Sequence, residues 1–213
     1  ISIDDGALKL TGGAITLEQA NVVGAITVED GSGDVSITEA DSIDGIDIAS
    51  IVRTSGGLTL NSGSNSIDQS GAISIGTGAL TLTGGAVTLK QDTNQFENLT
   101  INAGLVQIVE ANGVQFVGDS SASSLFLTLK GGSLTDSLTS SLIVSENTAL
   151  DVDNGAAIIL DASNDFGSSS GTLSIAAGGS GNVIINDDNS LTLASGNVAQ
   201  NLTITTGGKL DQD

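Results

Sequence analysis

Residues 6–19 read GALKLTGGAITLEQ, and residues 78–91 read GALTLTGGAVTLKQ. Eleven of these fourteen positions are identical, so the stretch that begins at Gly6 begins again at Gly78. A third, more diverged copy follows. A repeat of this size is typical of a solenoid, in which each unit stacks on the next and usually presents a surface rather than a pocket. We therefore predict a single β-solenoid of three repeats, at about 1–66, 67–133 and 134–213.

Each copy consists mainly of short apolar–polar–apolar triplets, such as Leu80-Thr81-Leu82. Period-two alternation predicts a strand with one buried face, so we expect both leucines inside and Thr81 outside. Steps such as Gly84-Gly85 and Gly131-Gly132 separate the triplets and predict tight turns. No segment shows the periodicity of an amphipathic helix, so we expect essentially no helix.

Strands this short suit a coil in which each strand bonds to its equivalent in the next turn. If each copy of ~70 residues holds about nine strands, three per turn, one turn takes ~23 residues. We therefore predict an all-β, right-handed parallel β-helix with about three strands per coil. A two-sided β-roll of ~18 residues per turn is the alternative, although gaps of ~7 to ~12 residues between triplets favour the helix.

An asparagine precedes an apolar residue at one corresponding step of every copy. The three steps are Asn21-Val22-Val23, Asn94-Gln95-Phe96 and Asn164-Asp165-Phe166. An Asn side chain can bond its own backbone in a turn, and stacked Asn side chains form ladders. We expect the asparagines to be structural and the apolar residues beside them to fill the interior.

The composition excludes several classes of partner. The chain carries 25 acidic and 5 basic residues, a net charge of -20. Nucleic acid and anionic membrane surfaces attract Lys and Arg clusters, so we expect neither partner. No apolar run approaches the ~20 residues that span a bilayer, so we expect no membrane insertion. The absence of Cys and His excludes the ordinary zinc, copper and haem ligand sets.

The two ends of the chain suggest a larger assembly. The chain starts at Ile1 rather than Met and shows no signal peptide, so we expect a segment of a longer protein. Stacked coils leave open strand edges, and the chain has no Pro to block them. We therefore expect the partner to be the protein itself or neighbouring repeats, end to end.

Acidic turns are the candidate metal ligands. Asp30 and Asp34 flank a Gly-Ser-Gly turn, and Asp187 and Asp188 precede Asn189 in a second predicted turn. Oxygen-rich turns can hold Ca²⁺, so calcium is the cofactor to consider. The alternative interpretation is that these carboxylates are solvated turn residues.

Two further functions can be weighed from the residues. Carboxylate pairs on a β-helix can cleave glycosidic bonds, and Asp151 and Asp153 should face outward together. However, the five basic residues are scattered and aromatic sugar platforms are scarce, so we predict no catalytic residue and no enzyme. A glycan-binding module would need a patch that breaks the repeat, for which the irregular stretch 119–124 is the candidate.

Segments such as NSIDQSGAISIGTGALTLTGG (65–85) and NDFGSSSGTLSI (164–175) resemble the repeats of filamentous haemagglutinin-like proteins and large autotransporter adhesins. The resemblance covers nearly the whole chain. It implies a right-handed β-helix, export through the outer membrane, and a structural or adhesive role that is extracellular or at the bacterial cell surface. Host or surface glycans then become candidate partners.

Overall fold

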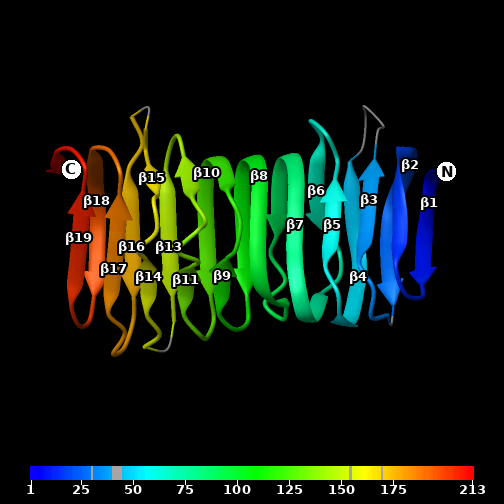
Figure 1. The fold of residues 1–213 in the computed structure, drawn as a ribbon, viewed down its shortest axis with the longest axis horizontal. Coiled ribbons are helices and arrows are strands. Elements are labelled where there is room, and N and C mark those ends of the chain that lie inside the picture. The colour runs from blue at the N-terminus through cyan, green and yellow to red at the C-terminus, as the bar shows by residue number, and fades with distance from the viewer. Residues whose placement is uncertain (30, 40–44, 154, 169) are drawn as a thin grey trace.

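A computed structural model describes residues 1–29, 31–39, 45–153, 155–168 and 170–213. These residues form twenty strands and no helix, and the strands wind into a rod with the two termini at opposite ends (Figure 1). The strands are β1 (Ser2–Thr11), β2 (Ile15–Glu29), β3 (Val35–Glu39), β4 (Ile46–Ser55), β5 (Leu58–Asn61), β6 (Ser66–Gln69), β7 (Ile73–Leu89), β8 (Gln95–Glu110), β9 (Val114–Phe116), β10 (Ser120–Leu129), β11 (Leu134–Asp136), β12 (Leu142–Val144), β13 (Thr148–Val152), β14 (Ile158–Leu160), β15 (Asp165–Phe166), β16 (Leu173–Ala177), β17 (Val183–Asp187), β18 (Leu191–Val198), β19 (Leu202–Thr206) and β20 (Leu210–Gln212).

The strands pair in parallel with strands that lie about one coil away along the chain. The length of a coil varies, being short where Asn98 pairs with Gln115 and longer where Leu150 pairs with Ile175. The described residues form about ten such coils. The predicted all-β, parallel β-solenoid without helix is therefore confirmed, whereas its right-handedness and its three strands per coil stay predictions. No helix long and apolar enough to cross a membrane occurs in the described residues.

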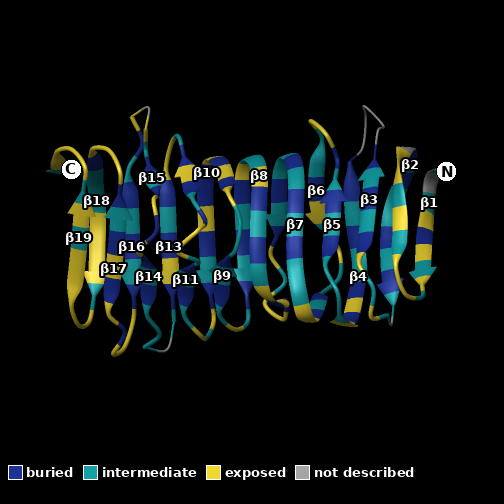
Figure 2. Cartoon of the chain, in the orientation of Figure 1, coloured by how far each residue is buried: buried dark blue, intermediate teal, exposed yellow. Residues whose placement is uncertain are grey.

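Alternation decides which side chains enter the interior. Leu58, Leu80 and Leu99 lie opposite one another in three successive coils, and all three are fully buried. Thr81 points outward between Leu80 and Leu82, as predicted, and is half-buried. The same alternation of buried and more exposed positions recurs from coil to coil (Figure 2). Burial of each such leucine contributes about 1.5–3 kcal/mol, so the continuous apolar interior holds the coils together.

Several strands are much longer than the predicted triplets. β7 has 17 residues and pairs in turn with β4, β5 and β6, so one continuous strand passes three strands of the preceding coil. The predicted turn at Gly84-Gly85 is wrong, because both residues lie inside β7. A Cβ atom on Gly85 would lie 2.1 Å from the carbonyl oxygen of Ser64. Glycine is needed here because two coils approach closely. The predicted turn at Gly131-Gly132 is confirmed, and Gly132 has a φ of 67°.

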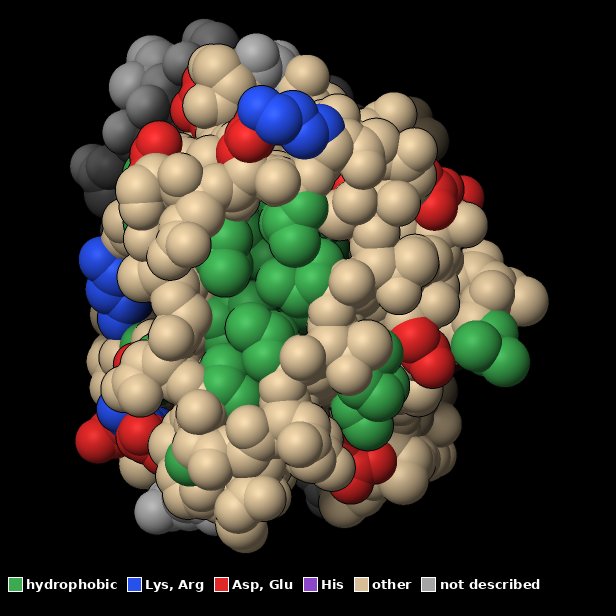
Figure 3. Space-filling model, turned by 90° about the vertical axis from the view of Figure 1, so that its left-hand side faces the viewer, with side chains coloured by type: hydrophobic (Ala, Val, Ile, Leu, Met, Phe, Trp, Pro, Cys, Tyr) green, Lys and Arg blue, Asp and Glu red, His purple; other side chains and the backbone are tan. Residues whose placement is uncertain are grey.

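The C-terminal end of the rod is open. β19 and β20 pair with β17 and β18 on one side and with no further strand among the described residues. Leu202 and Leu210 are 39% and 49% exposed. Figure 3 looks onto this end and shows hydrophobic side chains gathered at its centre, surrounded by backbone and other side chains. The apolar interior of the rod is therefore accessible at this end.

Candidate functional site

Buried carboxylates end several of the strands. Glu110 ends β8 and Asp187 ends β17, and both are fully buried, while Asp136 ends β11 and is 7% exposed. Each stands two positions after an inward apolar residue, so strand geometry turns its side chain inward. Sequence analysis missed Glu110 and Asp136. The signal that could have found them is an acidic residue at an inward position of the alternation.

The carboxylate of Glu110 joins two coils. Its Oε1 atom accepts a hydrogen bond of 3.2 Å from the backbone N–H of Phe96. Its Oε2 atom accepts a second bond from the backbone N–H of Asn112, in the turn that follows β8. The carboxylate thus gives two backbone donors an acceptor near the apolar interior, where an unsatisfied N–H is costly.

Asp187 repeats this arrangement in a later coil. Its Oδ2 atom accepts a bond of 2.7 Å from the backbone N–H of Phe166, and its Oδ1 atom accepts one of 2.9 Å from that of Asn189. The neighbouring Asp188 is exposed. The structure therefore separates the two predicted metal ligands, because one side chain lies in the interior and the other in the solvated turn.

The other predicted calcium ligands lie at the first acidic turn. Asp30 falls outside the described residues. The Oδ1 atom of Asp34 accepts a hydrogen bond of 2.8 Å from the backbone N–H of Gly57. In the part of the chain that the structure describes, no group of three or more His, Cys, Asp or Glu residues could hold a metal ion. Calcium binding at these two acidic turns stays a prediction.

The three asparagines that recur in the sequence are buried, as expected for structural residues. Asn21, Asn94 and Asn164 are 3%, 0% and 1% exposed. The Nδ2 atom of Asn94 donates to the carbonyl of Val109 at 3.0 Å, and that of Asn164 donates to Asp136 at 2.8 Å. The three asparagines do not stack on one another, because other coils lie between them. The apolar residues two positions later are also buried, as predicted: Val23, Phe96 and Phe166.

Burial perturbs the titration of the interior carboxylates. Loss of solvation raises the pKa of Glu110 from 4.5 to about 7, against the opposing effect of its backbone hydrogen bonds. The negative charge of Glu97 raises this pKa further. Burial likewise raises the pKa of Asp136 and of Asp187. Each of these three interior carboxyl groups therefore binds its proton more tightly than it would in water.

Arg53 is a buried base that sequence analysis also missed. It is 2% exposed, at an inward position of β4 opposite Ile75 of β7. Its Nη2 atom donates to the carbonyl of Gly33. Its Nε and Nη1 atoms have no hydrogen-bond partner among the described residues. The spacing of two from Ile51, an inward apolar residue, was the available signal.

Asp151 and Asp153, the pair considered for glycan chemistry, flank the buried Val152 and face outward, as predicted. Asp151 is exposed, whereas a carboxylate oxygen of Asp153 lies 3.4 Å from Nζ of Lys130. The stretch 119–124, the candidate binding patch, does not break the repeat, whereas glycan binding there stays a prediction. Most of it belongs to β10, which pairs regularly with β8 on one side and with β12 on the other.

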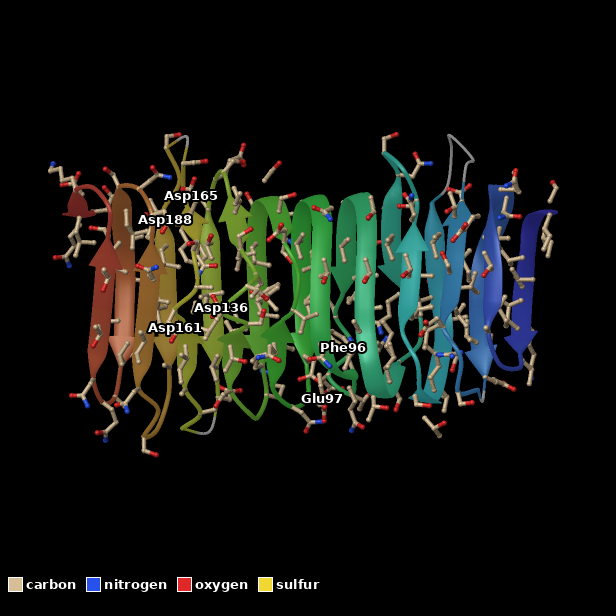
Figure 4. The ribbon with its side chains drawn as sticks, viewed as in Figure 1. Phe96, Glu97, Asp136, Asp161, Asp165 and Asp188 are labelled. Carbon is tan, nitrogen blue, oxygen red and sulfur yellow. The ribbon has the colours of Figure 1, made fainter. Side chains whose placement is uncertain are left out.

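Two shallow hollows on the surface are lined by residues that the structure describes. The larger, of about 440 Å³, follows β8, β9 and β11 on one flank of the rod. Its lining residues are Glu97, Asn98, Asn112, Gly113, Val114, Gln115, Ser133 and Thr135. The smaller, of about 390 Å³, lies at the turns near the C-terminal end and includes Asp188 and Asn189. In Figure 4, Glu97 lies near one edge of the rod, close to the turns.

Comparison with known proteins identifies a family without a known function. No curated protein and no solved structure matches the chain. A family model described as repeats of unknown function (DUF5649) matches residues 32–102, 103–176 and 180–213, which together make up most of the chain. The chain therefore belongs to the family of repeats of unknown function (DUF5649).

Proposed function

We propose that this chain is a structural and adhesive rod of an extracellular bacterial surface protein. The observation that carries the proposal is the unbroken parallel pairing from β1 to β20, which links one end of the rod to the other. A single apolar cluster, from Leu8 to Leu191, runs through the same coils. Each coil is thereby fastened to its neighbours by backbone bonds and by shared hydrophobic burial.

The turns are fastened as well as the strands. Glu110 and Asp187 bind backbone N–H groups of the preceding coil and of the following turn. Segments with many buried contacts and paired backbone groups open locally only at high free-energy cost. A solenoid built in this way is suited to hold a distance or to present an outer surface.

The net charge of the chain and the sequence of its repeats support a location outside the cell. A net charge of -20 keeps rods soluble at high density through mutual repulsion. The resemblance to filamentous haemagglutinin-like and autotransporter adhesin repeats supports a bacterial surface as the location. Antibody labelling of intact cells tests this part, and labelling only after lysis would overturn it.

We further propose that the coils stack end to end with neighbouring repeats or neighbouring copies. The C-terminal coil presents Leu202, Leu210 and the free edges of β19 and β20. These are the same kinds of group that join one coil to the next within the rod. An added coil could therefore continue both the backbone ladder and the apolar interior.

Electron microscopy of the purified native protein, with and without a calcium chelator, tests the rod. We expect fibres or long rods with an axial repeat of ~4.8 Å in diffraction. Compact particles without that repeat would overturn the structural role. Loss of the fibres on chelation would assign the acidic turns to calcium, and their persistence would remove calcium from the assembly.

A further inference from the structure

A row of three polar side chains crosses the larger of the two surface hollows, which we call the groove. Asn98 of β8 pairs with Gln115 of β9, and Gln115 pairs with Thr135 of β11. Successive members of such a row lie about 4.8 Å apart, because they stand on adjacent strands. The same row continues to Ala79 on one side and to Ile159 on the other. The polar stretch is therefore confined to three coils.

The turns beside this row are held by bonds of their own. The backbone N–H of Asn112 donates to the buried carboxylate of Glu110. The backbone N–H of Val114 donates to the carbonyl of Ser133 at 3.0 Å. Ser133 in turn accepts a bond of 3.2 Å at its Oγ atom from the backbone N–H of Ala157. The turn residues that a ligand would contact are therefore already ordered, which lowers the entropic cost of binding.

The hydrogen-bonding groups of the row are available. The side chains of Asn98, Gln115, Thr135 and Glu97 make no hydrogen bond to another residue in the described ranges, although all four line the groove. A carboxamide both donates and accepts, a hydroxyl does the same, and a carboxylate accepts. The groove thus offers a ligand a dense set of hydrogen-bond donors and acceptors.

The chemistry of the lining selects among ligands. No Lys or Arg is among the described residues that line the groove, and Glu97 contributes a negative charge. Sulfated, phosphorylated or uronic ligands would therefore be repelled, in a chain that already carries a net charge of -20. The volume of about 440 Å³ falls within the range of small-molecule sites. With no aromatic residue in the lining, we expect the affinity at a single groove to be on the order of millimolar.

We propose that this groove binds a short, neutral, hydroxyl-rich oligosaccharide. The row of Asn98, Gln115 and Thr135 would bond successive sugar hydroxyls along the rod, and Glu97 would accept from a hydroxyl at one end. This binding site would supply the ligand for the adhesive part of the function proposed above, and it does not depend on the structural part.

Nuclear magnetic resonance of the ¹⁵N-labelled chain tests the groove directly, because the side-chain NH₂ groups of Asn98 and Gln115 give their own signals. The probes are maltotriose, cellotriose and tri-N-acetylchitotriose, with trigalacturonate as the acidic comparison. We expect at least one neutral trisaccharide to shift both NH₂ signals in a saturable way. Trigalacturonate should shift neither signal.

Two variants locate the effect. The double variant Asn98→Ala/Gln115→Ala should abolish the backbone shifts that the active trisaccharide causes in β9 and β11. The matched control Gln107→Ala removes an outward carboxamide from the same strand β8, outside the groove, and should leave those shifts unchanged. Circular dichroism melting curves establish that each variant folds as the parent does.

The outcomes separate this inference from the structural role. The groove proposal is overturned if no neutral trisaccharide gives saturable shifts, if the double variant responds like the parent, or if only trigalacturonate binds. Fibres without saccharide binding would overturn the groove alone. Saccharide binding by compact particles that form no rods would support the groove and overturn the structural role.

Discussion

The Oδ2 atom of Asp187 lies 2.7 Å from the backbone nitrogen of Phe166, a residue 21 positions earlier in the chain. The contact joins two coils, since Phe166 belongs to β15 and Asp187 ends β17. Glu110 makes a similar contact with the backbone N–H of Phe96, which lies near the other end of its own long strand β8. Asp187 and Glu110, which end strands at inward positions, therefore belong to the framework of bonds that holds the coils together. The exposed side chain of Asp188, in the adjacent turn, does not.

The neighbouring residues Asp187 and Asp188 provide a matched test of this distinction. Asp187→Ala leaves the N–H groups of Phe166 and Asn189 without their acceptor and should lower the free energy of unfolding by about 1–3 kcal/mol. Asp188→Ala changes an exposed side chain and should stay within about 0.5 kcal/mol of the parent. Urea unfolding of the two variants measures the difference. Equal destabilisation by both would contradict the framework role of Asp187.

Glu110 should make stability depend on pH. Its carboxyl group titrates near 4.5 when unfolded and near 7 when folded, so the folded state holds the proton more tightly between these values. The contribution of this group to the free energy of unfolding is therefore greatest below pH 4.5. It should fall by roughly 3 kcal/mol as the pH rises past 7.

Urea midpoints measured from about pH 4 to about pH 8 check this dependence. Glu110→Gln removes the titrating group and should flatten the slope between pH 4.5 and 7. Glu18→Gln makes the same change of charge at an exposed position and should retain the parent's slope. If the slopes of the parent and of Glu110→Gln coincide, Glu110 is not the group responsible.

The interior leucines should tolerate no charge. Leu82 is fully buried between Leu60 and Ile101, so Leu82→Asp should destabilise the rod by about 3–5 kcal/mol through an unpaired buried charge. Thr81→Asp places the same group one residue away on the outer face and should cost less than about 1 kcal/mol. Thermal melting followed by circular dichroism compares them. Similar melting temperatures would disprove the inward assignment of Leu82.

The close approach of two coils at Gly85 predicts a steric effect. Gly85→Ala would place a methyl group 2.1 Å from the carbonyl oxygen of Ser64 and should destabilise by about 1–3 kcal/mol. Gly13 has no atom within 4 Å of such a methyl group, so Gly13→Ala serves as the control and should be nearly neutral. The melting temperatures of the two variants provide the measurement. A neutral Gly85→Ala variant would show that the coils can separate at this point without cost.

Much of the interior was predictable because strand geometry is local. The inward leucines and the buried Phe96 and Phe166 follow from alternation within a few residues. The same rule places Glu110 and Arg53 inside, yet a charged residue at the end of a short triplet is easily mistaken for the start of a turn. There the charge of the residue predicts a turn, whereas its place in the alternation predicts a buried position. The alternation decides, because the residue still belongs to the strand.

Alternation and the near-identity of residues 6–19 and 78–91 are sufficient to establish a parallel solenoid and its apolar interior, because each strand carries its own inward and outward faces. The partners of each strand in the next coil follow only from the folded chain. The coil that brings Asn98 to Gln115 is shorter than the one that brings Leu150 to Ile175, and each change of loop length shifts the register. The meeting of Asp187 with Phe166, and the row of Asn98, Gln115 and Thr135, depend on where each coil closes, which no local pattern determines.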